Sequence, residues 1–260
     1  MPLWFNTPYR ALPLPDQQMN AQITPFRLEK SRHAAPQVFE YLREQIMSLA
    51  LAPGTVLSRA DLVEQFGVSQ TPIRDALMRL AEEGLVDIYP QHATVVCAIN
   101  IALARQAHFL RRSVELEVVY TLASLADDSR AALVARLEAV LARQTAMLGL
   151  ADYMEFSAQD QRFHREMYEA AAVPDLWPLI RRQSGHLDRL RRLHLPIAGK
   201  AEAILADHRA ILDAISVGDP ARAQNMLRSH LSGTLANIDE IRARYPEYFD
   251  KGAIAAAGNA

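Results

Sequence analysis

Residues 58–86, SRADLVEQFGVSQTPIRDALMRLAEEGLV, constrain the fold more than any other segment of the chain. Apolar residues recur at helical spacing on both sides of residues 67–69, which predicts two short helices joined by a tight turn. Ser58 and Asp61 resemble a capping box at the start of the first helix. Gly84 is suited to end the second helix in a left-handed conformation. The segment therefore predicts a helix-turn-helix.

The flanking segments extend this unit. Residues 36–51 carry apolar side chains at helical spacing, and the turn-forming pair Pro53-Gly54 is expected to stop that helix. Residues 85–89 and 94–99 are β-prone runs separated by four turn residues, which is the pattern of a hairpin. Three helices followed by a two-stranded ribbon indicate a winged helix-turn-helix domain.

Beyond this domain the sequence predicts helix almost without interruption. Gly, Pro and Asp residues mark the breaks between helices that we place at roughly 100–126, 130–149, 152–172, 175–194, 198–217 and 220–243. The chain is therefore expected to be mainly α, with an N-terminal winged helix-turn-helix followed by an all-α helical bundle.

Four segments follow from these patterns. Residues 1–30 are rich in proline and show no steady period, so we expect an irregular arm. We place the winged helix-turn-helix at 31–99, the helical bundle at 100–243 and a C-terminal tail at 244–260.

Composition narrows the class of protein. The chain has 260 residues, a formal net charge of −2 and a single cysteine, so no intrachain disulfide can form. No apolar run is long enough to cross a membrane, and no secretory signal opens the chain, which together favour a cytoplasmic protein. Residues 32–89 hold more acidic than basic side chains. Phosphate binding there would depend on a few arginines gathered on one face.

The polar residues of the helix-turn-helix suggest what it binds. Gln70 and Arg74 share one face at the start of the second helix, with Thr71 beside them, and Arg59 begins the first helix. Arg can bind guanine and Gln can bind adenine, each good pair giving about 1–3 kcal/mol of discrimination. Alternatively, the segment is only a helical hairpin in a small core, because its apolar residues would be buried in either case. We favour the hypothesis that this helix enters the major groove of DNA.

At these residues the chain resembles the GntR family of bacterial winged-helix transcription regulators. The matching segments are PGTVLS (53–58), DLVEQFGVS (61–69), TPIRDALMRL (71–80) and EEGLV (82–86). The resemblance implies that Thr71 and Arg74 contact double-stranded operator DNA and that Arg79 contacts its backbone.

The chain departs from the family pattern at two places. Gln70 stands where the family usually has Arg, which should alter base preference or remove a contact. The tip of the wing reads His92-Ala93 where Arg-Gly is usual. Ala93 cannot adopt the dihedral angles open to glycine, so we expect weaker wing contacts, with His92 as the remaining candidate.

A second constellation suggests a metal site. Asp160 and His164 are one helical turn apart on one predicted helix. His208 and His230 each lie eleven residues from Asp219, in the turn between the last two helices. In an antiparallel pair both imidazoles would lie about 16 Å from that turn, at one level. Three imidazoles and one carboxylate suit Zn²⁺, Ni²⁺ or another borderline divalent ion.

The alternative is that these are scattered histidines of a helical bundle. We give that ordinary assignment to the remaining histidines, His33, His92, His108, His186 and His194.

The C-terminal part resembles the FCD domain, the all-helical effector domain of the FadR-like branch of the GntR family. The likeness spans about residues 102–242 and rests on 160–171, 207–223 and 228–230. It implies that Asp160, His164, His208 and His230 hold the metal inside the bundle.

Arg111 matches a position where the FCD family commonly has a ligand-pocket arginine, a residue suited to gripping a carboxylate. The alternative is a surface pair with Glu115. Most of the other basic clusters, Arg181-Arg182 and Arg189, Arg191 and Arg192, are interpreted as surface residues.

These observations predict a homodimeric transcription regulator, in our interpretation a repressor, that reads a pseudo-palindromic operator. Its bundle would bind a divalent metal and a small organic acid that changes operator affinity. Two alternatives use the same four residues: a metal-dependent hydrolase, and a metal sensor or structural zinc site. No nucleophile motif and no separate general base stand at recognisable spacing, so we do not expect an enzyme.

Overall fold

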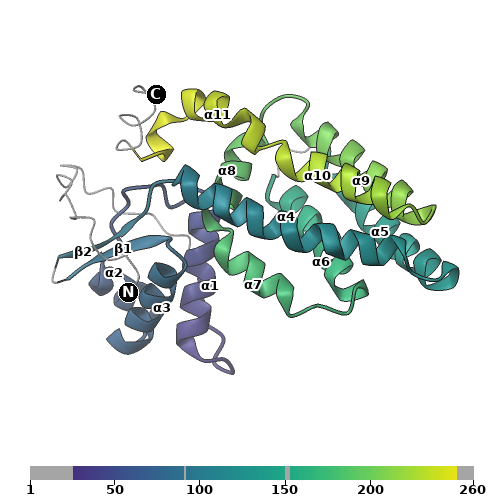
Figure 1. The fold of residues 1–260 in the computed structure, drawn as a ribbon. Helices are drawn as coiled ribbons and strands as arrows, with labels where there is room; N and C mark the ends of the chain where they lie inside the picture. The colour runs from purple at the N-terminus through teal and green to yellow at the C-terminus, as the bar shows by residue number, and fades with distance from the viewer. Residues whose placement is uncertain (1–25, 91, 150–152, 251–260) are drawn as a thin grey trace, which may run out of the picture.

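A computed structural model describes residues 26–90, 92–149 and 153–250, which form two helical parts (Figure 1). The smaller part carries the only β-strands of these residues, β1 and β2. The larger part is a helical bundle whose longest helix, α4, follows the second strand. The mainly α architecture that the sequence predicts is confirmed. No helix in the described ranges is both long and apolar enough to cross a membrane.

The N-terminal part is a winged helix-turn-helix. Its strands pair antiparallel, with Val86 opposite Val96. Its core is a cluster of buried apolar side chains from all three helices, among them Leu42, Leu62 and Leu77. The elements in chain order are α1 (Ala34–Met47), α2 (Arg59–Phe66), α3 (Gln70–Glu82), β1 (Val86–Tyr89) and β2 (Ala93–Val96).

The local sequence explains where these helices begin and end. The Ser58 hydroxyl accepts a hydrogen bond of 3.3 Å from the backbone N–H of Asp61, which caps α2 as the sequence predicts. Gly67 and Gly84 end α2 and α3 with φ of 63° and 67°, values that favour glycine. The expected end of the first helix is wrong, because α1 stops at Met47 rather than near residue 51.

Part of the expected N-terminal arm packs on this domain. The ring centroid of Phe26 lies 4.7 Å from that of Tyr41 and 6.2 Å from that of Phe66. Residues 26–30 form no helix or strand. Residues 1–25 of the arm lie outside the described residues.

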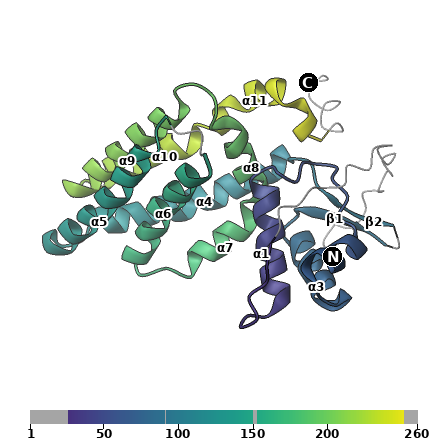
Figure 2. The same cartoon turned by 180° about the vertical axis from the view of Figure 1, so that it is seen from behind.

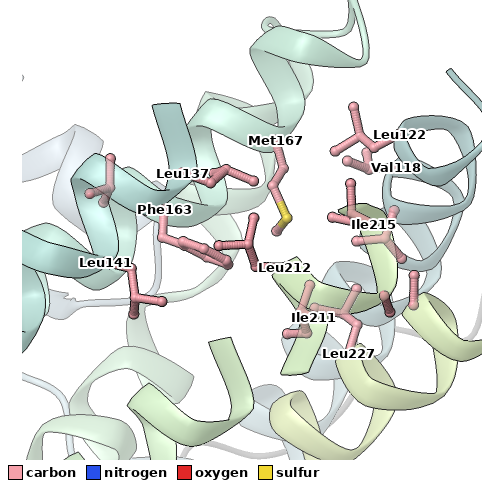
Figure 3. Packing of buried hydrophobic residues seen from close by; sticks show 14 of the residues in the cluster. Val118, Leu122, Leu137, Leu141, Phe163, Met167, Ile211, Leu212, Ile215 and Leu227 are labelled. Atoms are coloured by element: carbon pink, nitrogen blue, oxygen red, sulfur yellow. The ribbon is translucent and has the colours of Figure 1, made fainter. Parts of the chain in front are cut away.

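The C-terminal part is a bundle of helices around a main apolar core, and a second, smaller cluster of buried apolar residues joins α4, α8 and α11 (Ile238–Arg244) (Figures 1 and 2). Figure 3 shows Met167 within the main core, between Leu137 and Ile215. The main helices are α4 (Ile101–Ala123), α5 (Asp127–Ala146), α6 (Tyr153–Ala170), α7 (Leu176–Gln183), α8 (Gly185–His194), α9 (Lys200–Ser216) and α10 (Pro220–Ser232).

Two of the expected helices are each divided in two. The segment 175–194 breaks at Ser184 into α7 and α8. The segment 220–243 ends its first helix at Ser232 and continues, after a 3-10 turn, as α11 (Ile238–Arg244). The expected tail is wrong for residues 245–250, because Phe249 is buried and forms a bridge with Ile99. Residues 251–260 of the tail lie outside the described residues.

The first turns of α8 join the two parts. Gly185 faces Leu85 so closely that an added Cβ would lie 2.5 Å from Leu85 Cδ2. The imidazole Nδ1 of His186 accepts a hydrogen bond from the backbone N–H of Asn100, 3.1 Å away. Arg189 is fully buried and donates to the backbone oxygen of Cys97 at 2.6 Å, so its expected surface position is wrong.

Candidate nucleic-acid surface and metal centre

The start of α3 presents a polar face to solvent. Gln70, Thr71 and Arg74 are exposed, while Ile73 and Leu77 of the same helix are buried in the domain core. The Arg74 guanidinium lies 3.5 Å from the Asp75 carboxylate, and 62% of its side chain is exposed. Because such an exposed ion pair contributes little stability, Arg74 can exchange this partner for a base or a phosphate.

The other candidate DNA contacts differ in their surroundings. Arg79 lies about half a turn around the helix from Gln70, and its guanidinium carbon is 4.1 Å from the ring centroid of Phe39 on α1. This stacking turns Arg79 away from the face of Gln70 and Arg74. Arg59 is exposed at the first residue of α2, and His92 is exposed where the wing turns into β2.

Four residues from three helices meet inside the bundle. Asp160 and His164 come from α6, His208 from α9 and His230 from α10. All four side chains are buried, and one ligand atom from each lies within 4.8 Å of the others. The Nε2 atoms of His164 and His230 are 3.2 Å apart, and Nε2 of His208 lies 3.5 Å from Oδ1 of Asp160.

A second layer of polar groups orients the three imidazoles. Nδ1 of His164 lies 2.9 Å from Oε2 of Glu115, Nδ1 of His208 lies 2.9 Å from Oε1 of Gln144, and Nδ1 of His230 lies 3.4 Å from Oδ2 of Asp207. An Nδ1–H that donates outward leaves the Nε2 lone pair directed inward. This is the arrangement in which protein imidazoles bind metal ions.

The unsatisfied atoms of the cluster fit a cation. Arg191 pairs with Oδ2 of Asp160 at 2.6 Å, which leaves Oδ1 for the centre. Oδ1 of Asp160 and Nε2 of His208 are buried and have no hydrogen-bond partner. Buried polar atoms without partners are rare, and a divalent ion would satisfy both at once. The donor set therefore fits Zn²⁺ or Ni²⁺.

Electrostatics favours the protonation states that a metal requires. Burial lowers the pKa of His164 to about 4 and, reinforced by the charge of His230, holds the pKa of His208 well below its usual value. Burial acts to raise the pKa of Asp160, but Arg191 and the histidines outweigh it and hold that pKa well below the usual value. Neutral imidazoles and an ionised carboxylate are the binding forms.

Arg111 takes part in the second layer. Its Nε lies 2.6 Å from Oε1 of Glu115, and both side chains are buried, so the alternative of a surface pair is wrong in its exposure. Glu115 thereby joins Arg111 to His164. Arg111 also lines a small cavity together with Lys200 and His230.

A larger cavity, of about 120 Å³, opens beside the cluster. The bundle contributes Asp160, Arg191 and Lys200 to its lining, and α1 contributes Glu44 and Met47. The expected surface position of Arg191 is therefore wrong, because its guanidinium is held inside by Asp160.

Sequence reasoning missed the supporting residues. Gln144 and Lys200 stand in no motif, and their roles depend on how α5 and α9 pack. Glu115 was considered only as a partner of Arg111, although its spacing placed it on the same helix face.

Two family models match the chain. Residues 34–96 match the model described as bacterial regulatory proteins, gntR family, and residues 106–233 match the FCD domain. An uncharacterized HTH-type transcriptional regulator from an unstable DNA locus of Streptomyces ambofaciens is 36% identical over 212 residues, which cover 82% of this chain and 88% of that protein.

Less similar proteins also match most of the chain. The HTH-type transcriptional repressor RspR of Escherichia coli K12 is 27% identical over 86% of this chain and 97% of its own length. The solved structure of E. coli McbR/YncC is 22% identical and superposes with a TM-score of 0.67, covering 80% of this chain and 98% of that one. That structural likeness supports the fold.

Proposed function

Because the chain belongs to the GntR family of bacterial regulatory proteins and carries an FCD domain, we propose a homodimeric repressor controlled by a small organic acid at a metal site. The family makes it a DNA-binding transcription regulator and not an enzyme, so the hydrolase alternative is not pursued. Repression is supported by the name of the relative RspR. A DNA target implies that the protein acts in the cytoplasm.

Operator recognition is assigned to α3. Arg74 and Gln70 would reach base edges in the major groove, with Thr71 beside them, because these exposed residues share one helix face. Arg59, Arg79 and His92 are secondary candidates for the DNA backbone. Arg79 is the weakest of the three, because its guanidinium already stacks on Phe39.

The proposal that an effector controls DNA binding rests on the metal site. The decisive observation is that Oδ1 of Asp160 and Nε2 of His208 are buried without a hydrogen-bond partner, in a cluster whose four ligand atoms lie within 4.8 Å of one another. Asp160, His164, His208 and His230 would hold Zn²⁺ or Ni²⁺, which would supply a Lewis acid for an effector carboxylate. Lys200, which lines the adjoining cavity, is better placed to neutralise that carboxylate than Arg191 or Arg111, which are both paired with protein carboxylates.

The dimer is proposed from the outer face of α4. Four large apolar side chains that helical spacing puts on one face are exposed there: Leu103, Phe109, Leu110 and Tyr120. Leu179 on the neighbouring α7 is also exposed. Several large apolar side chains exposed on one helix face are typical of a protein–protein interface. Two-fold pairing would direct two α3 helices at a pseudo-palindromic operator.

The test uses duplexes drawn from the promoter region of the protein's own gene. Binding is measured by footprinting with the protein metal-loaded or metal-free, and with or without organic acids. We expect specific protection that an acid releases only from the metal-loaded protein. Protein that protects no such sequence in any of these states would contradict the proposal.

A metal sensor is the second candidate. Four buried protein ligands can complete a tetrahedral Zn²⁺ site without any effector. In that case adding or removing metal alone would change operator binding, and organic acids would have no effect.

A further inference from the structure

The larger cavity has walls from both parts of the protein. On one side Asp160, Arg191 and Lys200 belong to helices of the effector domain. On the other side Glu44 and Met47 belong to α1 of the winged helix-turn-helix, and Ser48 follows the end of that helix. A molecule that fills this cavity would therefore touch the DNA-binding domain directly.

Most of the cations that line this cavity are already neutralised. Three arginines form ion pairs of 2.6–2.7 Å with protein carboxylates, in the pairs Arg43–Glu83, Arg181–Asp188 and Arg191–Asp160. These carboxylates are buried or nearly so, which makes the pairs costly to separate. These paired arginines therefore shape the cavity and are not free to bind a ligand.

Two charges of opposite sign remain available. Lys200 lines both cavities, and within the described ranges its ammonium forms no hydrogen bond or ion pair. Glu44 lines the larger cavity from α1, and within the described ranges its carboxylate likewise forms no hydrogen bond or ion pair. Asp207 and Asp160 act on the Lys200 ammonium only from beyond ion-pair distance, and burial lowers the pKa of this group. An anion that reaches the ammonium directly therefore gains binding energy.

We propose that the effector has two polar ends: a carboxylate that binds Lys200 beside the metal cluster, and a hydroxyl or ammonium group that donates to Glu44 on α1. This inference rests on the proposed function and gives its effector a chemical class. Hydroxy acids and amino acids share this chemistry. The polar lining from Ser48, Ser157 and Gln161 suits the body of such a molecule.

A ligand with two polar ends also explains how binding reaches DNA. α1 packs on α3, and Arg43 on α1 pairs with Glu83 just after the end of α3. Arg43 also donates to the backbone oxygen of Arg181 in the effector domain, at 2.9 Å. A bridge from Lys200 to Glu44 therefore fixes α1, and with it α3, against the bundle. The ligand shifts operator affinity by binding this one arrangement better than others.

The test measures binding of matched acids to the full-length, metal-loaded protein by calorimetry. A straight-chain series of increasing length is used, each member as the plain acid, the ω-hydroxy acid and the ω-amino acid. At the best length we expect one of the two-ended acids to bind about tenfold more tightly than its plain counterpart, as a hydrogen bond to a charged group allows. Which of the two binds more tightly separates a hydroxy acid from an amino acid.

Substitutions at two residues test which residue binds which end of the ligand. Glu44→Gln should remove the preference for the two-ended acid while binding of the plain acid and the metal content stay unchanged. Lys200→Met should weaken all the acids, and Lys200→Arg should restore them. Glu40→Gln, one turn earlier on α1 and exposed beside Arg32, is the matched control and should keep the preference.

The outcomes separate this inference from the function on which it rests. Plain and two-ended acids that bind equally well, or a preference that survives Glu44→Gln, overturn the two-ended ligand and leave acid control of the operator intact. Metal-loaded protein that binds none of the acids overturns both. Operator footprints on the same samples then show whether DNA binding itself survives.

Discussion

His164 and His230 face each other across the centre of the bundle, with their Nε2 atoms 3.2 Å apart. Each has its Nδ1 near a carboxylate, that of Glu115 or Asp207. With both Nδ1 atoms protonated, the two Nε2 lone pairs point at one another, an arrangement that a bound cation stabilises. The metal is therefore expected to contribute to the stability of the bundle as well as to effector binding.

The first prediction concerns this site. The double variant His208→Ala with His230→Ala should lose nearly all bound metal, measured by elemental analysis, because half of the ligand set is gone. Chelator should lower the melting temperature of the wild type but not that of the variant, since only the wild type is stabilised by binding. His33→Ala with His92→Ala removes two exposed imidazoles and should keep the metal. Equal metal content in both double variants would contradict the assignment.

The second prediction concerns the residue that orients His208. Gln144→Leu removes the acceptor 2.9 Å from Nδ1 of that imidazole while keeping an apolar volume of similar size. Metal affinity should fall about 10–100-fold, as for other second-layer partners. The measurement is a competition titration against a chromogenic chelator. A merely structural role for Gln144 would instead lower the melting temperature of the metal-free protein and leave the affinity unchanged.

The third prediction concerns operator reading. Arg74→Ala should weaken specific DNA binding about 10–100-fold, which corresponds to the loss of one bidentate base contact. The far-ultraviolet circular dichroism and melting temperature should not change, because Arg74 is exposed. Arg136→Ala removes an exposed arginine from α5 and serves as the control. If both variants give the same footprint as the wild type, α3 does not read the operator through Arg74.

The fourth prediction concerns the outer face of α4. Phe109 is 66% exposed, and Phe109→Asp would place a charge in the proposed dimer interface. Central aromatic residues often contribute about 2 kcal/mol or more to association, so the variant should sediment as a monomer at concentrations where the wild type is a dimer. Val217→Asp changes a 63% exposed apolar residue just after the end of α9 and should have no effect. A wild type that sediments as a monomer would refute the dimer.

Much of this architecture is predictable from short-range patterns, and the failures have physical causes. The meeting of His208 and His230 follows from their equal distance to the turn at Asp219, because helix rise is constant. The break between α7 and α8 is not predictable from Gly185, because a single glycine inside a helical pattern is also compatible with a continuous helix. The apolar core of the winged helix follows from periodicity alone.

Sequence patterns do not predict the parts of the site that depend on how the helices pack against one another. Arg191 reaches Asp160 because α8 crosses α6, and Lys200 faces the same cavity because α9 begins there. Neither relationship can be obtained from spacing within one helix. Basic clusters are usually solvated, so the prediction of surface positions followed the commonest case.

The last prediction uses the only cysteine. Cys97 lies where the second strand leads into α4, and its backbone oxygen accepts from Arg189. Burial, reinforced by the charge of Asp87, raises the pKa of its thiol to about 12. Only the thiolate reacts with alkylating agents, and it becomes abundant only as pH rises through that value. At pH 8 the thiolate fraction is about 10⁻⁴, against roughly a quarter for an unperturbed cysteine.

Iodoacetamide at pH 8 should therefore modify Cys97 about a thousandfold more slowly in the native protein than in denaturant, as followed by mass spectrometry. Arg189→Met removes the contact that holds the strand-to-helix connection against α8, and it also removes a positive charge that lowers the pKa of Cys97. Loss of that charge alone would slow the reaction, so a faster native rate in this variant would report opening of the connection. Arg165→Met, an exposed arginine of α6, is the matched control. Equal rates in the native and denatured protein would show that this connection is open in solution and that Arg189 does not hold it against α8.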